Sequence, residues 1–273
     1  MKIALTVAGS DSGGGAGIQA DLKTFHQFGV YGTSAIVAVT AQNTVGVRAV
    51  HAVPAAMVEA QLDAIAEDLP PDAFKTGMLA TAALARQVAQ AVQRYRWANY
   101  VLDPVMIATS GDRLLSPDAE AVVRDQLVPL AAVVTPNLGE ASILTGTLVD
   151  DPAGMARAGI RLVEMGAGAA LIKGGHSPGD LLVDLLVTRS GTRRFEHPRI
   201  VTRSTHGTGC TLSAAITAGL ALGLPLETAT ETGLDYLQRA IAAAPGLGTG
   251  HGPVDHTVAV MIPSISRATR SPA

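Results

Sequence analysis

The sequence contains a single cysteine, few aromatic residues and few charged ones. One cysteine, Cys210, can form neither an internal disulfide nor a cysteine-based zinc site, so a disulfide-stabilised secreted fold is excluded. Aromatic residues make up 3% of the 273 residues, too few for the stacking platforms that bind bare nucleic acid. The net charge is −3, and the densest basic run is Arg193-Arg194. A cytoplasmic protein with small-molecule partners and no nucleic-acid partner is therefore expected.

The sequence also lacks a recognisable targeting or membrane segment. The N-terminal apolar stretch ends at Ala8, which is too short for a signal peptide. The uncharged stretch over residues 204–226 is interrupted by four glycines and Pro225, so it predicts a buried helix and no membrane contact. No repeat or change of composition divides the chain. One domain is expected over residues 1–260, followed by a polar tail over residues 261–273.

Strand-like and helix-like segments alternate along the chain. Strands are expected over residues 2–8, 34–40, 73–76, 100–103, 132–135, 169–173, 181–187 and 193–197. Helices are expected over residues 15–28, 58–69, 81–95, 210–222 and 226–243, with a further helix starting at Ser116-Pro117. The alternation predicts an α/β fold, a mostly parallel sheet with helices on both faces. In such folds ligands bind at the carboxyl ends of the strands.

A glycine-rich loop over residues 8–17 directly follows the first predicted strand. It lacks the Gly-Lys-Ser/Thr of a Walker A loop, because the nearby lysine, Lys23, lies well inside the next helix. A relaxed dinucleotide fingerprint from Gly15 to Ala20 has no acidic partner at the required distance, since no Asp or Glu occurs between Asp21 and Glu59. A tight loop without a ligand stays open as an alternative.

Two further motifs follow strands or begin helices. Residues 175–179 match a nucleophile elbow, but Pro178 has no N–H for an oxyanion hole, so a surface turn is favoured. Residues 205–211 (Thr-His-Gly-Thr-Gly-Cys-Thr) open a long apolar helix whose N-terminal N–H groups can bind an anion. The helix dipole there is expected to lower the pKa of Cys210. A buried structural cysteine is the alternative.

Polar residues cluster after three of the predicted strands. Asp103, the pair Asn137 and Glu140, and Lys173 each follow a strand. Carboxylate and amide oxygens suit Mg²⁺, and an ammonium group suits phosphate, so the set is typical of Mg²⁺-assisted phosphate chemistry. The spacing of Asn137 and Glu140 also fits a helix capping box.

Taken together, the motifs identify a family. They are residues 8–21 (Ala-Gly-Ser-Asp-Ser-Gly-Gly-Gly-Ala-Gly-Ile-Gln-Ala-Asp), 40–44 (Thr-Ala-Gln-Asn-Thr), 75–79 (Lys-Thr-Gly-Met-Leu), 103–106 (Asp-Pro-Val-Met), 135–137 (Thr-Pro-Asn), 173–176 (Lys-Gly-Gly-His) and 206–211 (His-Gly-Thr-Gly-Cys-Thr). From about residue 3 to His256 the chain resembles the hydroxymethylpyrimidine/phosphomethylpyrimidine kinases of thiamine biosynthesis, in the ribokinase-like superfamily. The resemblance implies a three-layer αβα sandwich. It also implies two ATP- and Mg²⁺-dependent steps, from 4-amino-5-hydroxymethyl-2-methylpyrimidine to its monophosphate and then its diphosphate.

The resemblance also implies roles for individual residues. Cys210 matches the catalytic base, Gly207 and Gly209 contribute with it to the anion hole for the transferring phosphoryl group, and Lys173 contacts the ATP phosphates. Gln42 matches the residue that recognises the pyrimidine, in a pocket lined by Asp21, Met78 and Val105. The nucleotide site comprises Asp103, Asn137, Glu140, Lys173 and Thr208, and Asp103 and Glu140 hold Mg²⁺ directly or through water. A homodimer is implied as well. A kinase of vitamin B6 type with broader specificity, and a non-catalytic pyrimidine-binding regulator, are the alternatives.

Overall fold

The computed structural model describes residues 1–106, 115–175 and 179–262. Its strands are β1 (Ile3–Gly9), β2 (Tyr31–Asn43), β3 (Gly46–Ala52), β4 (Ala73–Thr76), β5 (Tyr100–Leu102), β6 (Val133–Val134), β7 (Ala169–Ile172), β8 (Leu181–Thr188) and β9 (Gly191–Pro198). Its helices are α1 (Gly17–Gln27), α2 (Ala55–Asp68), α3 (Ala82–Tyr95), α4 (Pro117–Val122), α5 (Leu138–Thr145), α6 (Pro152–Glu164), α7 (Thr208–Ala221) and α8 (Leu226–Ala242). After α4 the chain continues through a π-helical turn, η1 (Val123–Leu127), and a 3₁₀ turn, η2 (Val128–Leu130).

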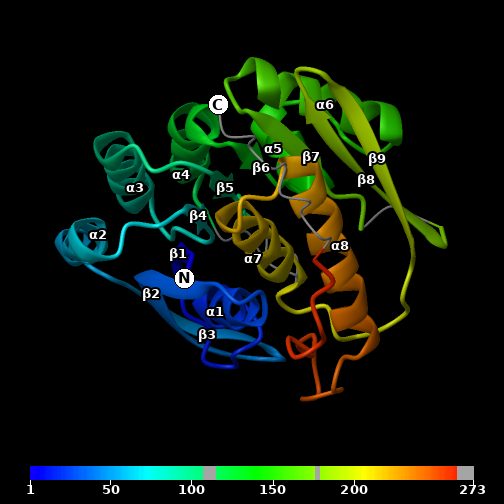
Figure 1. Cartoon of the computed structure of the whole chain (residues 1–273), viewed down its shortest axis with the longest axis horizontal. Coiled ribbons are helices and arrows are strands. Elements are labelled where there is room, and N and C mark those ends of the chain that lie inside the picture. The colour runs from blue at the N-terminus through cyan, green and yellow to red at the C-terminus, as the bar shows by residue number, and fades with distance from the viewer. Residues whose placement is uncertain (107–114, 176–178, 263–273) are drawn as a thin grey trace, which may run out of the picture.

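All of these strands join one sheet, in the order β3-β2-β1-β4-β5-β6-β7-β8-β9. The central strands from β2 to β7 pair in parallel, whereas β3 at one edge and β8 and β9 at the other pair antiparallel (Figure 1). The α/β fold with a mostly parallel sheet, predicted from the alternating pattern, is confirmed.

Helices cover both faces of the sheet, because consecutive residues of the central strands point to opposite sides and both sides are apolar. Val133 packs in a core with Leu212 of α7 and Leu237 of α8, whereas the next residue, Val134, packs in the core that includes Leu62 of α2. Helix α1 joins α7 and α8 on their side, and α2 to α6 cover the other (Figure 1). This gives the three layers of the predicted sandwich.

Most predicted elements are found within a few residues of their expected bounds, but three were missed. Strand β3 contributes nothing to the core, since all seven of its residues are exposed, its valines included. Helix α5 is only eight residues long, and its capping box was the available signal. Helix α6 contains two buried glycines, and Gly159 lies so close to Val187 that an added Cβ would be 2.4 Å from a Val187 methyl. The Asp151 cap and Pro152 at its start are the sequence signals that indicate this helix.

The sheet reverses its strand order between β1 and β4, and loops from their carboxyl ends meet there. Helix α7 packs against β1, β4 and β5, so its N-terminus reaches the same edge. Among the described residues, no helix has the length and apolar character needed to cross a membrane. Residues 263–273 of the predicted tail lie outside the described residues, and the single-domain boundary at residue 260 stays a prediction.

Candidate active site

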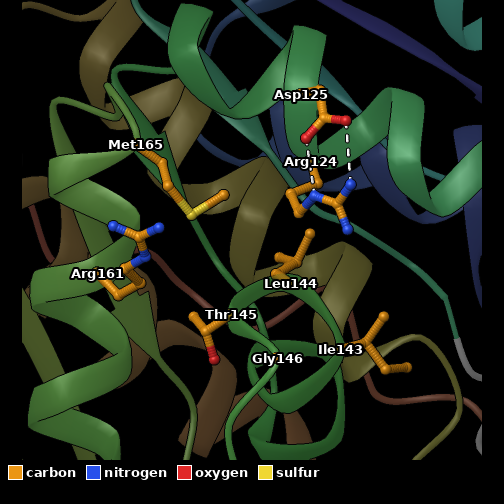
Figure 2. Close-up of a pocket in the computed structure, with 8 residues that line it drawn as sticks. All are labelled: Arg124, Asp125, Ile143, Leu144, Thr145, Gly146, Arg161 and Met165. Atoms are coloured by element: carbon orange, nitrogen blue, oxygen red, sulfur yellow. Dashed lines mark hydrogen bonds and ion pairs between the residues drawn. The ribbon is translucent and has the colours of Figure 1, made fainter.

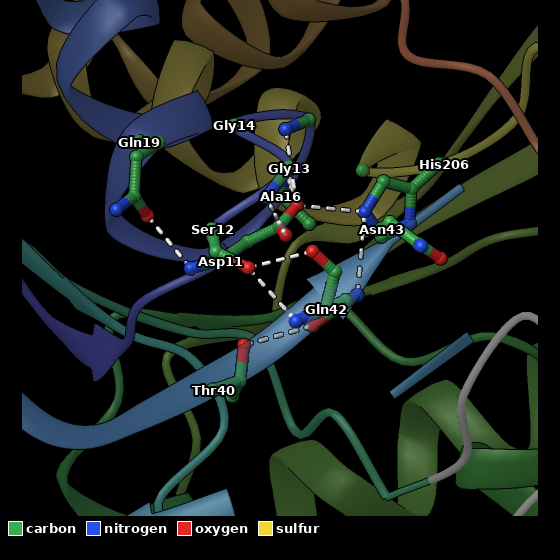
Figure 3. A network of polar contacts seen from close by, with 12 residues as sticks. Asp11, Ser12, Gly13, Gly14, Ala16, Gln19, Thr40, Gln42, Asn43 and His206 are labelled. Carbon is green, nitrogen blue, oxygen red and sulfur yellow. Dashed lines mark hydrogen bonds and ion pairs between the residues drawn. The ribbon is translucent and has the colours of Figure 1, made fainter. Parts of the chain in front are cut away.

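Asp11 organises the glycine-rich loop between β1 and α1. Its carboxylate accepts hydrogen bonds from the backbone N–H groups of Gly13 at 2.8 Å, Gly15 at 3.0 Å and Ala16 at 2.9 Å. It also lies 2.8 Å from Nε2 of His206 (Figure 3). Burial raises the pKa of Asp11, but the hydrogen bonds from His206 and the loop outweigh it, so the pKa is lowered. The loop is thus built around an ionised carboxylate.

The same loop is hydrogen-bonded to the end of β2, where Gln42 lies. The Ser12 hydroxyl donates to the carbonyl of Gln42 at 2.6 Å and accepts from its N–H at 2.8 Å. The Gln42 carboxamide lies between Thr40 and His206, at 3.3 Å from each (Figure 3). Gln42, predicted to recognise the pyrimidine, is therefore held by the glycine-rich loop and by the residue that precedes Gly207.

Gly207 brings the N-terminus of α7 against the glycine-rich loop. Its backbone is left-handed, with φ +79°, and it is the N-cap of α7. A Cβ at Gly207 would lie 1.8 Å from the carbonyl oxygen of Gly15, so the position has no room for a side chain. Gly209 and Cys210 follow in the first turn, where backbone N–H groups lack partners within the helix. Thr208 donates its hydroxyl to the carbonyl of Thr205 at 3.1 Å.

Asp21 lies beneath these loops in a buried ion pair with Lys75. The two side chains have no exposed surface, and Asp21 also accepts from the Thr6 hydroxyl at 2.6 Å. Asp21 was predicted to line the substrate pocket, but its side chain has no exposed surface in this structure and contacts Lys75 and Thr6. Burial tends to lower the pKa of Lys75, but Asp21, followed by Cys210 and Asp103, together outweigh it, so the pKa is raised and the ammonium stays charged. No role was predicted for Lys75 from the sequence, although a lysine within the apolar strand β4 indicates a buried charge that needs a partner.

Cys210 is half-buried at the start of α7 and lies within electrostatic range of Lys75. Burial raises the pKa of the thiol to about 12, and the charge of Lys75 only partly opposes this. Asp21 and Asp103 raise it further. The expectation that this pKa would be lowered is wrong, because burial and two nearby carboxylates raise it. The thiol is protonated at neutral pH.

Asp103 and Lys173, predicted from two different strand ends, meet beside α7. Lys173 Nζ lies 3.5 Å from Asp103 Oδ1, and the Ser213 hydroxyl donates to the other carboxylate oxygen at 3.1 Å. Burial lowers the pKa of Lys173, but Asp103 and then Glu140 outweigh it, so the pKa is raised. A Cβ at Gly209 would lie 3.4 Å from Lys173 Nζ, which places a cation next to the free amides of the helix. Ser213 was missed, since helix interiors contain many such serines.

Glu140 forms the capping box that its spacing predicted, and it does more. It accepts from the Asn137 N–H at 2.9 Å, while its own N–H donates to Asn137 Oδ1 at 2.9 Å. Its second carboxylate oxygen accepts from the N–H of Met106 at 3.2 Å. Burial and then Asp103 raise the pKa of Glu140, against the charge of Lys173. Glu140 thereby connects the turn after β5 to the start of α5.

Met78 and Val105, predicted to line the substrate pocket, follow β4 and β5. The methyl of Met78 occupies the space that a side chain at Gly9 would take, since an added Cβ there would lie 2.7 Å from it. Val105 has φ +41°, a left-handed conformation that is strained for a β-branched residue. Its neighbour Met106 is fully buried and hydrogen-bonded to Glu140, which holds the strained turn in place.

The arrangement fits Mg²⁺ that is bound chiefly through a nucleotide. In the part of the chain that the structure describes, no group of three or more His, Cys, Asp or Glu residues could hold a metal ion. Asp103 and Glu140 nevertheless both act on Lys173, and one or two carboxylates with substrate phosphates suffice for Mg²⁺. Residues 176–178 of the predicted surface turn lie outside the described residues.

A separate hollow of about 320 Å³ lies at the opposite end of α5 (Figure 2). It is lined by residues of η1, of α5 and its C-cap, and of the last turn and C-cap of α6: Arg124, Asp125, Ile143, Leu144, Thr145, Gly146, Arg161 and Met165. Arg124 is paired with Asp125 at 2.7 Å, and Arg161 with Glu164 at 3.3 Å. Both cations are neutralised by neighbours, so the hollow offers no free charge to a ligand.

Comparisons with known proteins agree with the motifs. The family model described as phosphomethylpyrimidine kinase matches residues 11–255. A hydroxymethylpyrimidine/phosphomethylpyrimidine kinase of Rhizobium meliloti is 52% identical over 93% of this chain and 96% of its own length. The protein of the same name from Bacillus subtilis is 47% identical over 93% of this chain and 94% of its own.

Solved structures show the same fold. A phosphomethylpyrimidine kinase from Clostridium difficile 630 has a TM-score of 0.81 and 41% identity, over 88% of this chain and all of that one. An ADP complex of Bacillus subtilis pyridoxal kinase has a TM-score of 0.89 and 37% identity, over 94% and 98%. The ribokinase-like sandwich that the resemblance implied is confirmed, and the chain belongs to the phosphomethylpyrimidine kinase family.

Proposed function

We propose that this chain transfers the γ-phosphoryl group of ATP to 4-amino-5-hydroxymethyl-2-methylpyrimidine, and then to its monophosphate, in thiamine biosynthesis. One observation carries the proposal: Lys173 and Asp103 lie against Gly209, at the N-terminus of α7. A helix N-terminus and a charged lysine stabilise the negative charge of a transferring phosphoryl group, which is what this reaction requires. The use of ATP is supported by relatives named hydroxymethylpyrimidine/phosphomethylpyrimidine kinase. It is also supported by solved structures of pyridoxal kinase bound to ADP or AMP-PCP.

The residues divide between the nucleotide and the alcohol. Lys173 contacts the ATP phosphates, and the amides of Gly209 and Cys210 bind the phosphoryl group in transfer. Asp103 and Glu140 would hold Mg²⁺, which neutralises phosphate charge when bound. Asn137 and Thr208 complete the nucleotide side. Each of these side chains or amides belongs to the strand-end loops or to the two helices that begin there.

Cys210 accepts the hydroxyl proton in this proposal. With a pKa of about 12, the thiol first gives its own proton to water, and the thiolate then takes the proton of the substrate hydroxyl as that oxygen bonds to the γ-phosphorus and ADP leaves. The charge of Lys75, and then a hydrogen bond from the backbone of Gly17, lower the pKa of Cys210, so both support the thiolate. Phosphoryl transfer passes through a loose transition state in most analyses, and little proton abstraction is needed early. The anion hole is therefore expected to contribute more than the base.

Substrate choice is tested by supplying ATP, Mg²⁺ and one alcohol at a time, and resolving the products by mass. Diphosphate formed from the aminopyrimidine supports both steps. Pyridoxal kinases are among the similar structures, so pyridoxal is the second alcohol to test. Turnover of pyridoxal alone would overturn the proposal. A mixture of both products would support a kinase of broader specificity.

We also propose that the protein is a cytoplasmic homodimer. Strand β3 is an edge strand whose residues are all exposed, and exposed edges favour pairing with another chain. Large apolar side chains are exposed on and around it, including Val45, Val47 and Val50. Sedimentation equilibrium tests this proposal. A mass of 27.8 kDa across the concentration range would show a monomer and contradict it.

A further inference from the structure

Thr40 and His206 contact the carboxamide of Gln42, and Asp11 contacts His206 (Figure 3). In the structure its Oε1 lies 3.3 Å from Thr40 Oγ1, and its Nε2 lies 3.3 Å from His206 Nε2. Rotating the carboxamide by half a turn exchanges its oxygen and nitrogen, and each neighbour still has an amide atom beside it. The orientation therefore follows from which neighbours donate a proton and which accept one.

His206 must donate on the side that faces Gln42. Its Nε2 lies 2.8 Å from Asp11 Oδ2, and an ionised carboxylate can only accept. Asp11 also receives three backbone N–H bonds, so it is already the acceptor at the centre of the loop. His206 Nε2 therefore carries a proton in both the neutral and the charged ring. A protonated nitrogen cannot accept the amide N–H of Gln42, but it can share its proton with an amide oxygen.

Thr40 gives the same result independently. Its hydroxyl has one proton, which it donates to the carbonyl of Ser10 at 2.8 Å, a shorter contact than the one to Gln42. The hydroxyl then offers Gln42 only lone pairs, so the amide nitrogen belongs on its side. Both neighbours favour one orientation, with the nitrogen toward Thr40 and the oxygen toward His206.

We propose that Asp11, His206 and Thr40 are positioning residues that hold the Gln42 carboxamide in this orientation, and that they thereby set the preference for a 4-aminopyrimidine ring. The inference rests on the proposed function. The fixed amide keeps one N–H and one lone pair for the ligand, in a defined order. An amino group beside a ring nitrogen presents a donor and an acceptor in a matching order. A ring without the amino group leaves one of the two amide groups unpaired, which costs binding energy.

Paired variants test the inference. Thr40→Val removes the hydroxyl and keeps the branched shape, and Thr40→Ser keeps the hydroxyl as the matched control. His206→Leu removes the donor nitrogen, and His206→Gln retains one at similar reach. For each protein, kcat and KM are measured at saturating ATP with the 4-aminopyrimidine alcohol and with the same alcohol lacking the 4-amino group. Thermal unfolding verifies that every variant is folded.

The readout is the ratio of the two kcat/KM values. We expect Thr40→Val and His206→Leu each to reduce this ratio about fivefold, the worth of one uncharged hydrogen bond, mainly through a higher KM for the amino substrate. Thr40→Ser and His206→Gln are expected to keep the wild-type ratio. Equal losses with both alcohols would show a structural role only and overturn the inference. A wild-type chain that does not turn over the amino substrate would overturn the proposed function as well.

Discussion

Lys75 Nζ lies 2.7 Å from Asp21 Oδ1, and neither side chain has any solvent-exposed surface. The pair acts on Cys210 with opposite signs, because the charge of Lys75 lowers the pKa of the thiol and that of Asp21 raises it. A buried ion pair gains little net stability over an apolar pair of the same shape. Its position beside the only cysteine therefore points to a role in the chemistry of Cys210.

Breaking this pair from one side should be costly. Lys75→Met leaves the Asp21 carboxylate buried without its partner, which is expected to lower the free energy of unfolding by roughly 3–5 kcal/mol. Guanidinium unfolding followed by circular dichroism measures the change. Lys2→Met is the matched control, because Lys2 forms an ion pair of 2.6 Å with Asp72 on the surface. The two substitutions should differ clearly, and losses of equal size would contradict the prediction.

The Cys210 thiol should react slowly with alkylating reagents at neutral pH. Because the pKa is about 12, only a small fraction is thiolate at pH 7, and the rate should rise about tenfold per pH unit without levelling off before pH 10. Iodoacetamide modification followed by mass spectrometry measures the rate at a single site, since the chain has one cysteine. Lys75→Met should slow the reaction further. A plateau near pH 7 would show that the thiol is activated after all.

Cys210→Ser should reduce turnover strongly while ATP still binds. The serine hydroxyl fits the space of the thiol but loses its proton even less readily, so less of the basic form is present and the loss should appear in kcat, with nucleotide affinity unchanged. Steady-state kinetics and calorimetric titration with ATP separate these two effects. Turnover close to that of the unmodified chain would remove Cys210 from the mechanism and leave the reaction to the anion hole and Lys173.

The convergence of the polar motifs could be predicted from the sequence, because parallel strands bring their carboxyl ends to one edge of a sheet. Asp103 and Lys173 were each assigned to that edge from neighbouring residues alone, and they meet there at 3.5 Å. The capping box of Asn137 and Glu140 could also be predicted from nearby residues, because a cap depends on residues three positions apart. Local signals thus predicted which of these side chains meet at this edge, and their roles stay predictions.

Properties that depend on long-range packing could not be predicted. The pKa of Cys210 depends on burial and on Asp21 and Asp103, which are distant in sequence. The partner of Lys75 lies 54 positions away, so the buried pair leaves no pattern in the sequence. Strand β3 was missed for the opposite reason: its exposed residues contact no core, and only its antiparallel pairing with β2 defines it.

Gly207→Ala should damage both stability and activity. The left-handed backbone disfavours a side chain, and the new Cβ would collide with the carbonyl of Gly15, so the helix N-terminus or the glycine-rich loop must move. We expect a lower melting temperature and a loss of kcat of at least about a hundredfold, since a shift of 1 Å is enough for that. Gly46→Ala is the control, because its Cβ would meet nothing within 4 Å. Equal behaviour of the two variants would contradict the proposed constraint.

His256 should make the protein less stable in mild acid. It is buried, and its Nε2 lies 3.0 Å from the hydroxyl of Thr211, which itself donates to the carbonyl of Gly207. Burial, and then the charge of Lys23, lower the pKa of His256 to about 4, against the opposing charge of Asp255. Between this value and the unfolded value near 6.5 the unfolded chain binds the extra proton, so stability falls as the pH falls through this window.

Between pH 6.5 and 4, His256 is expected to lower the free energy of unfolding by roughly 3 kcal/mol in total. Above pH 7 it has no such effect. Urea unfolding at a series of pH values measures it as the difference between the wild-type chain and His256→Gln, which retains a donor for Thr211 but does not titrate. The two stability curves should lie closer together in acid than at pH 7, because only in the wild-type chain does unfolding expose a ring that then binds a proton. His26→Gln, on the exposed side of α1, controls for the substitution itself. Parallel curves for the wild-type chain and His256→Gln would show that His256 is not held neutral by its surroundings, and that the support for Gly207 through Thr211 does not depend on pH.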